Sequence, residues 1–188
     1  MQGHGAPSGV HPHFIYNNEA SRTNHEQRRP YLATALKNNP KEFEEMEILI
    51  SDITQFICQG IIKEIPDSYN NLRVFCELLP LNHRSSTHPF PGYVLNVNVC
   101  TVGHKDTNDV DICVVIPGGA FKGGELVLHE AGLVLELVEG DVLVFPSWKI
   151  THFNLHFKGV RFSLVMHSDK EVSSWNRDRN GWIGHMVV

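Results

Sequence analysis

Two residues that can bind a metal ion, His104 and Asp106, lie two positions apart in the segment GHKDTND. On an extended backbone, residues i and i+2 project to the same face, so both side chains can reach one ion. An imidazole and a carboxylate together suit a divalent metal of borderline softness. The alternative is a polar turn without a metal, because 12 histidines and 21 acidic residues make such a pair common by chance. The chain has a second such pair at His167 and Asp169, so the spacing alone leaves both interpretations open.

A third ligand would have to come from a later strand beside the first. His152 follows the apolar segment VLVFP, at the point where the chain turns back, and Arg161 and Ser163 then share one face of another apolar segment. A buried guanidinium requires a partner, because an unpaired buried charge is very costly. That partner is either an internal acid, such as Glu125 or Glu136, or the carboxylate of a bound ligand. A ligand carboxylate would account for Arg161 and Ser163 together.

Short apolar segments separated by turn residues run through the second half of the chain and predict the sheet that positions these side chains. Glycine and proline punctuate them, for example at Pro117 and at Gly123. Such spacing is typical of a sandwich or barrel of the jelly-roll kind. The predicted strands cover residues 93–102, 111–117, 124–130, 133–139, 142–146 and 160–168.

Upstream of these strands, residues 41–65 place apolar side chains at spacings of three and four, which predicts an amphipathic helix. Its acidic first turn suits the helix dipole. We expect the apolar stripe to pack on the sheet as a support rather than to bind a partner. The stripe consists of Phe43, Met46, Leu49, Ile50, Ile53, Phe56, Ile57 and Ile61. Residues 68–79 form a second short element, and the pattern leaves open whether it is a helix or a strand.

The length and composition indicate one globular domain. The chain has 188 residues, of which 41% are hydrophobic and 20% charged. Residues 1–29 have a polar, Gly- and Pro-rich composition without an apolar period, so we expect a flexible N-terminal arm. Residues 30–188 would form the single domain. Within it, the segment WNRDRNGW at 175–182 is either a lid over the site or a surface tail.

Charge and cysteine usage limit the cellular setting. The formal net charge of -5 argues against a strongly basic nucleic-acid surface, although it leaves room for a local basic patch. The four cysteines are far apart and form no CxxC pair, so we expect free thiols in a reducing compartment. We find neither an apolar run long enough to span a membrane nor a secretory signal. We therefore expect an intracellular protein, cytoplasmic or nuclear, without a membrane partner.

Two histidines and one carboxylate on one face of an octahedron form the iron site of non-haem Fe(II) oxygenases. The order His104-x-Asp106, His152, Arg161-x-Ser163 resembles the Fe(II)/2-oxoglutarate-dependent oxygenase superfamily. The segments NVNVCTVGHKDTND and GAFKGGELVLHEAGLVLELVEGDVLVFPSWKITHF are most similar to its TET/JBP-like branch, especially the compact fungal members. The resemblance covers roughly residues 91–168. It implies a mainly β fold with supporting helices (α+β), a double-stranded β-helix of the jelly-roll, cupin-like kind.

The resemblance also implies roles for individual residues. His104, Asp106 and His152 would bind Fe(II). Arg161 would bind the far carboxylate of the cosubstrate 2-oxoglutarate, and Ser163 would assist. Asn96 or Asn98, on the strand before the ligand pair, would contact the other end of the cosubstrate. Asn108, Asp109 and Asp111 follow the ligand pair, near the mouth of the site. They would either contact the substrate or form a polar loop, and the sequence slightly favours the loop.

His156 is a rival for the third ligand position. It lies only five residues before Arg161, which leaves too little chain to turn at Lys158-Gly159 and return at the far end of a cosubstrate. The sequence therefore favours His152.

The implied activity is hydroxylation of a C–H bond by O2, with release of succinate and CO2. The substrate remains open: a small molecule, an amino acid or a protein side chain suits the acidic charge and small size. A TET/JBP-like enzyme would instead oxidise a methylated nucleobase in DNA or RNA after flipping it out of the helix. A non-catalytic jelly-roll binding module is the third alternative. The sequence indicates no oligomeric state.

Overall fold

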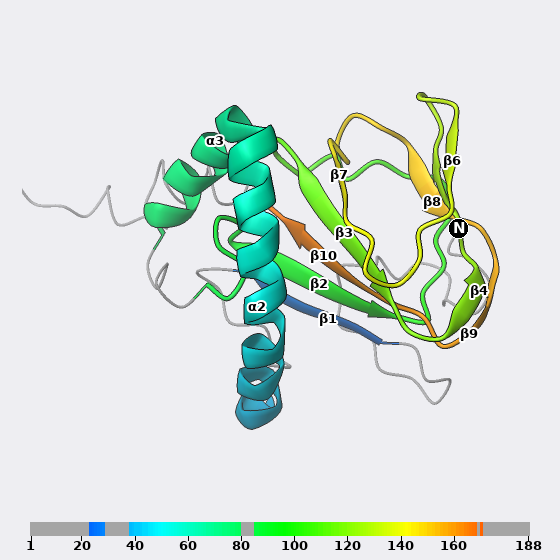
Figure 1. Ribbon diagram of the computed structural model, residues 1–188, viewed down its shortest axis with the longest axis horizontal. Helices are drawn as coiled ribbons and strands as arrows, with labels where there is room; N and C mark the ends of the chain where they lie inside the picture. Colours follow the sequence, from blue (N-terminus) through cyan, green and yellow to red (C-terminus); the bar gives the residue numbers. More distant parts are fainter. Residues whose placement is uncertain (1–22, 29–37, 80–84, 169, 171–188) are drawn as a thin grey trace, which may run out of the picture.

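The computed structural model describes residues 23–28, 38–79, 85–168 and 170. Within these residues the fold has two helices and ten strands, and every strand pair is antiparallel. The helices α2 (Pro40–Glu64) and α3 (Pro66–Glu77) lie on one side of the largest sheet (Figure 1). Neither described helix combines the length and apolar character that crossing a membrane requires. The prediction of a mainly β fold with supporting helices is therefore confirmed.

The largest sheet has five strands in the order β1-β2-β10-β3-β7. Its strands are β1 (Thr23–Arg28), β2 (Gly92–Val97), β10 (Phe162–His167), β3 (Cys113–Gly118) and β7 (Leu143–Phe145). A smaller sheet has the order β6-β5-β8, with β6 (Leu133–Leu135), β5 (Leu126–Leu128) and β8 (His152–Asn154). A two-stranded ribbon joins β4 (Phe121–Gly123) to β9 (Phe157–Gly159).

Side chains alternate between the two faces of the largest sheet, as the period of two in a strand requires. On β10, Leu164 and Met166 point toward the helices, whereas Ser163 and Val165 line a pocket on the opposite face. The helix-facing core contains Ile57, Ile61, Leu72, Phe90, Tyr93, Val114, Ile116, Leu164 and Met166. The pocket is lined from both sheets, so it lies between them. One face of the sheet thus supports the fold and the other is available for a site.

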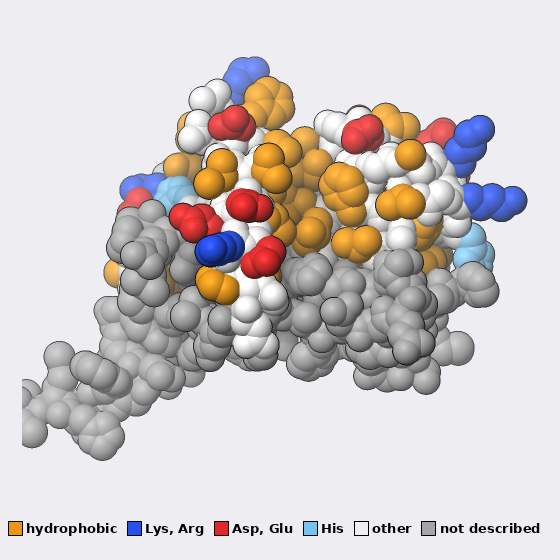
Figure 2. Space-filling model, turned by 90° about the horizontal axis from the view of Figure 1, so that it is seen from below, with side chains coloured by type: hydrophobic (Ala, Val, Ile, Leu, Met, Phe, Trp, Pro, Cys, Tyr) orange, Lys and Arg blue, Asp and Glu red, His pale blue; other side chains and the backbone are white. Residues whose placement is uncertain are grey.

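The predicted helix over 41–65 is confirmed as α2, and its inner stripe packs on the sheet. The undetermined element at 68–79 is the helix α3, which begins at Pro66, a residue suited to the first turn because it needs no N–H partner there. Other apolar side chains of α2 stay exposed, including Leu49 and Phe56. Figure 2 shows hydrophobic side chains gathered across the middle of the face seen from below.

Two sequence predictions require correction. Within the arm expected over 1–29, residues 23–28 form the strand β1, which pairs with β2. The long strand expected over 93–102 ends at Val97, because Asn98 takes a left-handed backbone conformation with φ 53°. The short strands β4, β8 and β9 were not predicted. The segment 175–182 lies outside the described residues.

Candidate metal centre and adjoining pocket

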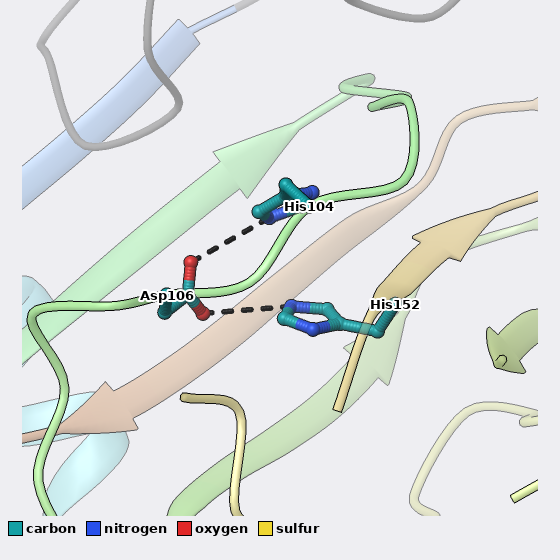
Figure 3. A group of neighbouring side chains, drawn as sticks. All are labelled: His104, Asp106 and His152. Atoms are coloured by element: carbon teal, nitrogen blue, oxygen red, sulfur yellow. Dashed lines mark ion pairs between the residues drawn. The ribbon is translucent and has the colours of Figure 1, made fainter. Parts of the chain in front are cut away.

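The side chains of His104, Asp106 and His152 converge on one point (Figure 3). The Nε2 atom of His104 lies 3.6 Å from one carboxylate oxygen of Asp106, and Nε2 of His152 lies 3.4 Å from the other. Each residue offers one ligand atom, and these three atoms all lie within 4.8 Å of one another. Among the described residues these three form the one group of this kind. The structure thus brings together the three residues that the sequence indicated as ligands.

The backbone fixes the orientation of both imidazoles. Nδ1 of His104 lies 2.8 Å from the carbonyl oxygen of Val102, and Nδ1 of His152 lies 2.9 Å from that of Ile150. With these nitrogens protonated, each Nδ1–H donates to a carbonyl and leaves the Nε2 lone pair toward Asp106. A hydrogen bond from the second ring nitrogen is the usual way in which a protein orients a metal-binding histidine.

A single antiparallel bridge pairs His104 with His152 and explains why two distant segments deliver neighbouring rings. The backbone N–H of each residue donates to the carbonyl of the other, at 3.2 and 2.9 Å. Residues directly opposite in an antiparallel pair place their side chains on the same face. Accordingly, the two ring centres lie 4.5 Å apart.

The donor set fits a divalent transition metal. Two neutral imidazoles and one carboxylate suit Zn²⁺ or Fe²⁺, and three ligands on one side leave open positions for other molecules. Metal bonds of about 2.1 Å would place adjacent octahedral ligand atoms about 3 Å apart. The distances of 3.4 and 3.6 Å are slightly longer, so a small inward movement of the side chains would complete the coordination.

The electrostatics at His152 favour positive charge. Burial by itself lowers the pKa of this imidazole, but the hydrogen bond and the charge of Asp106 outweigh it, so the pKa is raised overall. The carboxylate of Asp106 stabilises a cation beside it, as expected for an acid next to a basic group in a poorly hydrated position.

A pocket of about 80 Å³ adjoins the three ligands, between the two sheets. This volume exceeds the roughly 15 Å³ that one water needs, so it has room for several waters or a small ligand. Besides the ligands, its wall is formed by Val94, Asn96, Val99, Thr101, Cys113, Val115, Leu126, Asn154, Ser163 and Val165. A mostly apolar wall with a few polar groups is typical of a site for a small molecule.

Arg161 is buried, with 4% of its surface exposed. Its guanidinium carbon lies 5.4 Å from the ring centre of Phe121 and 5.9 Å from that of Phe157. Its Nε atom is buried without a hydrogen-bond partner. Within the described part of the chain no acid forms an ion pair with Arg161, which excludes the internal salt bridge to Glu125 or Glu136 considered above. This arrangement leaves the guanidinium able to bind an anion.

Arg161 is not one of the residues that line the pocket. Gly124 lies between Arg161 and a residue of the pocket wall. A Cβ atom added at Gly124 would stand 3.3 Å from Cδ and Nε of Arg161. The carbonyl of Gly124 accepts a hydrogen bond of 3.0 Å from the side-chain amide of Asn154, which does line the pocket. Gly124 also has φ +79°, so a larger residue would be strained there.

The other residues expected to bind the cosubstrate differ in placement. Ser163 and Asn96 are opposite each other in the β10–β2 register and both line the pocket. Asn98 lies beyond the end of β2, and its side-chain oxygen accepts a hydrogen bond of 2.9 Å from the backbone N–H of Arg161. Asn98 therefore holds the backbone of Arg161, while Asn96 and Ser163 face the pocket.

Of the residues expected at the substrate, Asn108 is exposed beside the metal ligands. Asp109, in contrast, is only 5% exposed. Its carboxylate accepts a hydrogen bond of 2.7 Å from Ser147 and lies 3.3 Å from Nδ1 of His167. Asp111 likewise accepts a hydrogen bond of 2.9 Å from Ser68. These carboxylates brace the loop after the ligand pair, which is the polar-loop role that the sequence left open for Asp109 and Asp111.

Sequence reasoning missed several residues at this site. Asn154 and Cys113 line the pocket, and burial raises the pKa of the Cys113 thiol well above its usual range. Glu130 contacts Lys105 and Thr151, which are sequence neighbours of all three expected ligands. The alternation along the strands could have indicated Cys113. The role of Glu130 depends on a contact across 21 residues that no local pattern reveals.

Comparisons with solved structures identify the fold. The chain is similar to the structure of NgTET1 in complex with 5mC DNA, with a TM-score of 0.66 and 19% sequence identity over 78% of this chain. The match spans 61% of the length of NgTET1. No protein-family model and no curated protein matches the sequence.

Two further solved structures are less similar to this chain. A 2OG-Fe(II) oxygenase family oxidoreductase from Burkholderia pseudomallei has a TM-score of 0.38, with 30% identity over 42% of each chain. A Pseudomonas putida prolyl-4-hydroxylase has a TM-score of 0.35, with 15% identity over 80% of this chain and 74% of that one. Both scores are too low to establish a shared fold. The fold is therefore the one found in NgTET1, which confirms the predicted likeness to the TET branch at the level of the fold.

Proposed function

We propose that this protein is an Fe(II)/2-oxoglutarate-dependent dioxygenase with a jelly-roll, double-stranded β-helix core. The observation that carries the proposal is the convergence of two imidazole Nε2 atoms and one carboxylate at the wall of a pocket. Two histidines and one carboxylate with open positions are the ligand set of non-haem Fe(II) oxygenases. The fold shared with NgTET1 supports this choice over other uses of the same ligands.

In the proposed reaction a substrate C–H bond, O2 and 2-oxoglutarate yield a C–OH bond, succinate and CO2, and the bound iron would supply the oxidation chemistry. The residues of this chain bind and orient. His104, Asp106 and His152 would hold the iron. Arg161 would pair with the distal carboxylate of 2-oxoglutarate, since a guanidinium and a carboxylate can form two parallel hydrogen bonds. Ser163 and Asn96 would contact the cosubstrate from the pocket wall.

The proposal predicts that variants of the three expected ligands lose metal binding, whereas a variant of a nearby histidine keeps it. Alanine at His104, Asp106 or His152 should abolish the weak visible absorption band that forms on anaerobic addition of Fe(II) and 2-oxoglutarate. His156→Ala is the matched control, because His156 is exposed and faces a different surface near Lys122 and Lys158. It should retain the band. A wild-type protein without a band or a metal-dependent thermal shift would favour a non-catalytic binding module instead.

Oxidation of a methylated base in DNA is the second candidate function. It is favoured by one observation, the fold shared with NgTET1, which was solved with 5mC DNA. The net charge of -5 opposes it, because DNA binding depends largely on neutralising phosphates. Succinate release should be measured with a 5-methylcytosine oligonucleotide, its unmethylated counterpart and a panel of amino acids and metabolites. Coupled release with the methylated oligonucleotide alone would establish this second candidate and reject a small-molecule substrate.

A further inference from the structure

One carboxylate connects the two chain segments that carry the metal ligands. Glu130 lies in the turn between β5 and β6. Its Oε1 atom lies 2.7 Å from Nζ of Lys105 and accepts a hydrogen bond of 2.7 Å from the hydroxyl of Thr151. Its Oε2 atom accepts a hydrogen bond of 2.6 Å from the backbone N–H of Thr151. All three contacts therefore depend on a single side chain.

Both partners of Glu130 are immediate neighbours of metal ligands. Lys105 lies between His104 and Asp106, and Thr151 directly precedes His152. Successive side chains of an extended segment point to opposite faces, so Lys105 and Thr151 lie on the back of the segments whose fronts carry the ligands. The side chain of Lys105 is partly exposed there and is paired with Glu130.

Few backbone hydrogen bonds join these segments: besides the pair between His104 and His152, the backbone N–H of Asp106 donates to the carbonyl of Ser147 at 3.2 Å. They meet at the isolated bridge between His104 and His152 rather than in a continuous ladder. A displacement of one segment along the other would change the distances of 3.6 and 3.4 Å from the Nε2 atoms to Asp106. Metal affinity is sensitive to such shifts, because it depends on ligands held close to the productive geometry. A second connection on the back of the bridge would limit this movement.

Glu130 has the charge and geometry for this connection. The bonds from Lys105 and Thr151 hold its carboxyl pKa far below its usual range, at about 2, so it is ionised at neutral pH. The side chains of Lys105 and Glu130 are 39% and 42% exposed, so solvent and salt weaken their ion pair. The two bonds from Thr151 are short and have an ionised acceptor, which makes them the stronger part of the connection.

We propose that Glu130 is a positioning residue for the metal centre: through Lys105 and Thr151 it holds the His104–Asp106 segment against the segment of His152. The inference rests on the proposed metal site and adds a residue outside the ligand set. Groups that hydrogen-bond directly to metal ligands typically change metal affinity about 10–100-fold when they are removed. Glu130 acts through the neighbours of the ligands, so we expect a change at the lower end of this range.

The experiment is an anaerobic titration of the full chain with Co²⁺, which gives visible bands that report coordination geometry. Glu130→Ala removes all three contacts, and Glu130→Gln keeps an acceptor oxygen for Thr151 but loses the charge. Glu139→Gln is the matched control, because Glu139 is an exposed acid at the next turn of the chain. We expect Glu130→Ala to bind Co²⁺ at least about tenfold more weakly, with altered bands, and Glu130→Gln to be intermediate. Glu139→Gln should equal wild type.

Controls separate failure of this inference from failure of the proposed function. Wild-type protein that does not bind Co²⁺, or that binds it equally well after His152→Ala, overturns both. Wild-type protein that binds at the site, with unchanged affinity and bands in Glu130→Ala, overturns only the role of Glu130. Should Glu130→Ala unfold, Thr151→Val and Lys105→Met each remove one contact, and these variants must then weaken Co²⁺ binding while their apo proteins still unfold in a cooperative thermal transition. Unchanged binding in both variants also rejects the role.

Discussion

Arg161 shows what a single residue can disclose about function. It is a buried cation between two aromatic rings, without an acidic partner among the described residues. Contacts of a cation with aromatic faces recover part of its lost hydration, but less than a carboxylate would. Burying a charge in this way costs stability, which supports the proposal that Arg161 binds an anionic ligand. The residue is therefore expected to be important for function and unfavourable for stability.

This gives opposite expectations for activity and stability. Arg161→Met should raise the KM for 2-oxoglutarate by at least about tenfold, since the charge-assisted pair is lost. The same change should leave the free energy of unfolding equal or increase it by about 1 kcal/mol, because an unpaired buried charge is removed. Steady-state kinetics and urea unfolding measure the two quantities. The Co²⁺ affinity of Arg161→Met should stay at the wild-type value. A free energy of unfolding several kcal/mol lower than that of wild type would show that Arg161 has a structural partner instead.

At the scale of secondary-structure elements, α2 supports the sheet through one of its faces. Ile61 is 2% exposed and packs in the core on the helix side of the sheet, whereas its neighbour Ile62 is 45% exposed. The sheet between α2 and the pocket carries Asn96 and Ser163 on its opposite face. Packing of α2 therefore maintains the strands that form the pocket wall.

The two neighbouring isoleucines provide a matched pair of variants. Ile61→Ala should lower the free energy of unfolding by about 2–5 kcal/mol, since it removes buried apolar surface and leaves a cavity. Ile62→Ala should change it by less than about 1 kcal/mol, because alanine has the higher helix propensity and the side chain is largely solvated already. Chemical denaturation measures both. Equal losses would show that α2 presents a different face to the sheet.

The turn that carries Glu130 gives a prediction about pH. Because the pKa of Glu130 is lowered to about 2 from its ordinary value of 4.5, its contribution is fully present above about pH 4.5. The contribution is lost as pH falls from there toward 2, when the carboxyl becomes protonated. At pH 6 the melting temperature of the apo wild-type protein should therefore be higher than that of apo Glu130→Gln. This difference in melting temperature should shrink steadily below pH 4.5. A difference that stays constant down to pH 2.5 would contradict the assignment.

At the scale of the whole molecule, the candidate metal centre joins separate parts of the fold. His104 and Asp106 follow the last strand residues of β2 in the large sheet, whereas His152 begins β8 in the small one. A bound metal would therefore connect the segment after β2 to the first residue of β8, beside the pocket. The match to NgTET1 spans 61% of the length of that chain.

Metal loading should stabilise the molecule as a whole. A ligand that binds only the folded state adds about 2.7 kcal/mol of stability at one hundred times its Kd. Melting of the apo protein, the metal-loaded protein and the loaded protein after chelator treatment should show a rise and a full return. Asp106→Ala should show no rise at the same metal concentration. An equal rise in that variant would mean that the metal binds elsewhere.

The sequence by itself determined the features that have a local period or spacing. These are the amphipathic helix over 41–65, the series of short strands, and the placement of His104 and Asp106 on one face of their segment. Each of these patterns arises within a few consecutive residues, so it can be read without knowing which distant segments meet.

Only the tertiary structure decided how distant segments combine. The bridge to His104 places His152, and not His156, beside Asp106. The hydrogen bond with Ser147 turns Asp109 inward. The strand β1 forms inside a polar segment because its backbone pairs with β2, a contribution that side-chain composition does not reveal. The contacts of Glu130 likewise depend on tertiary structure, since its partners are adjacent in space and far away along the chain.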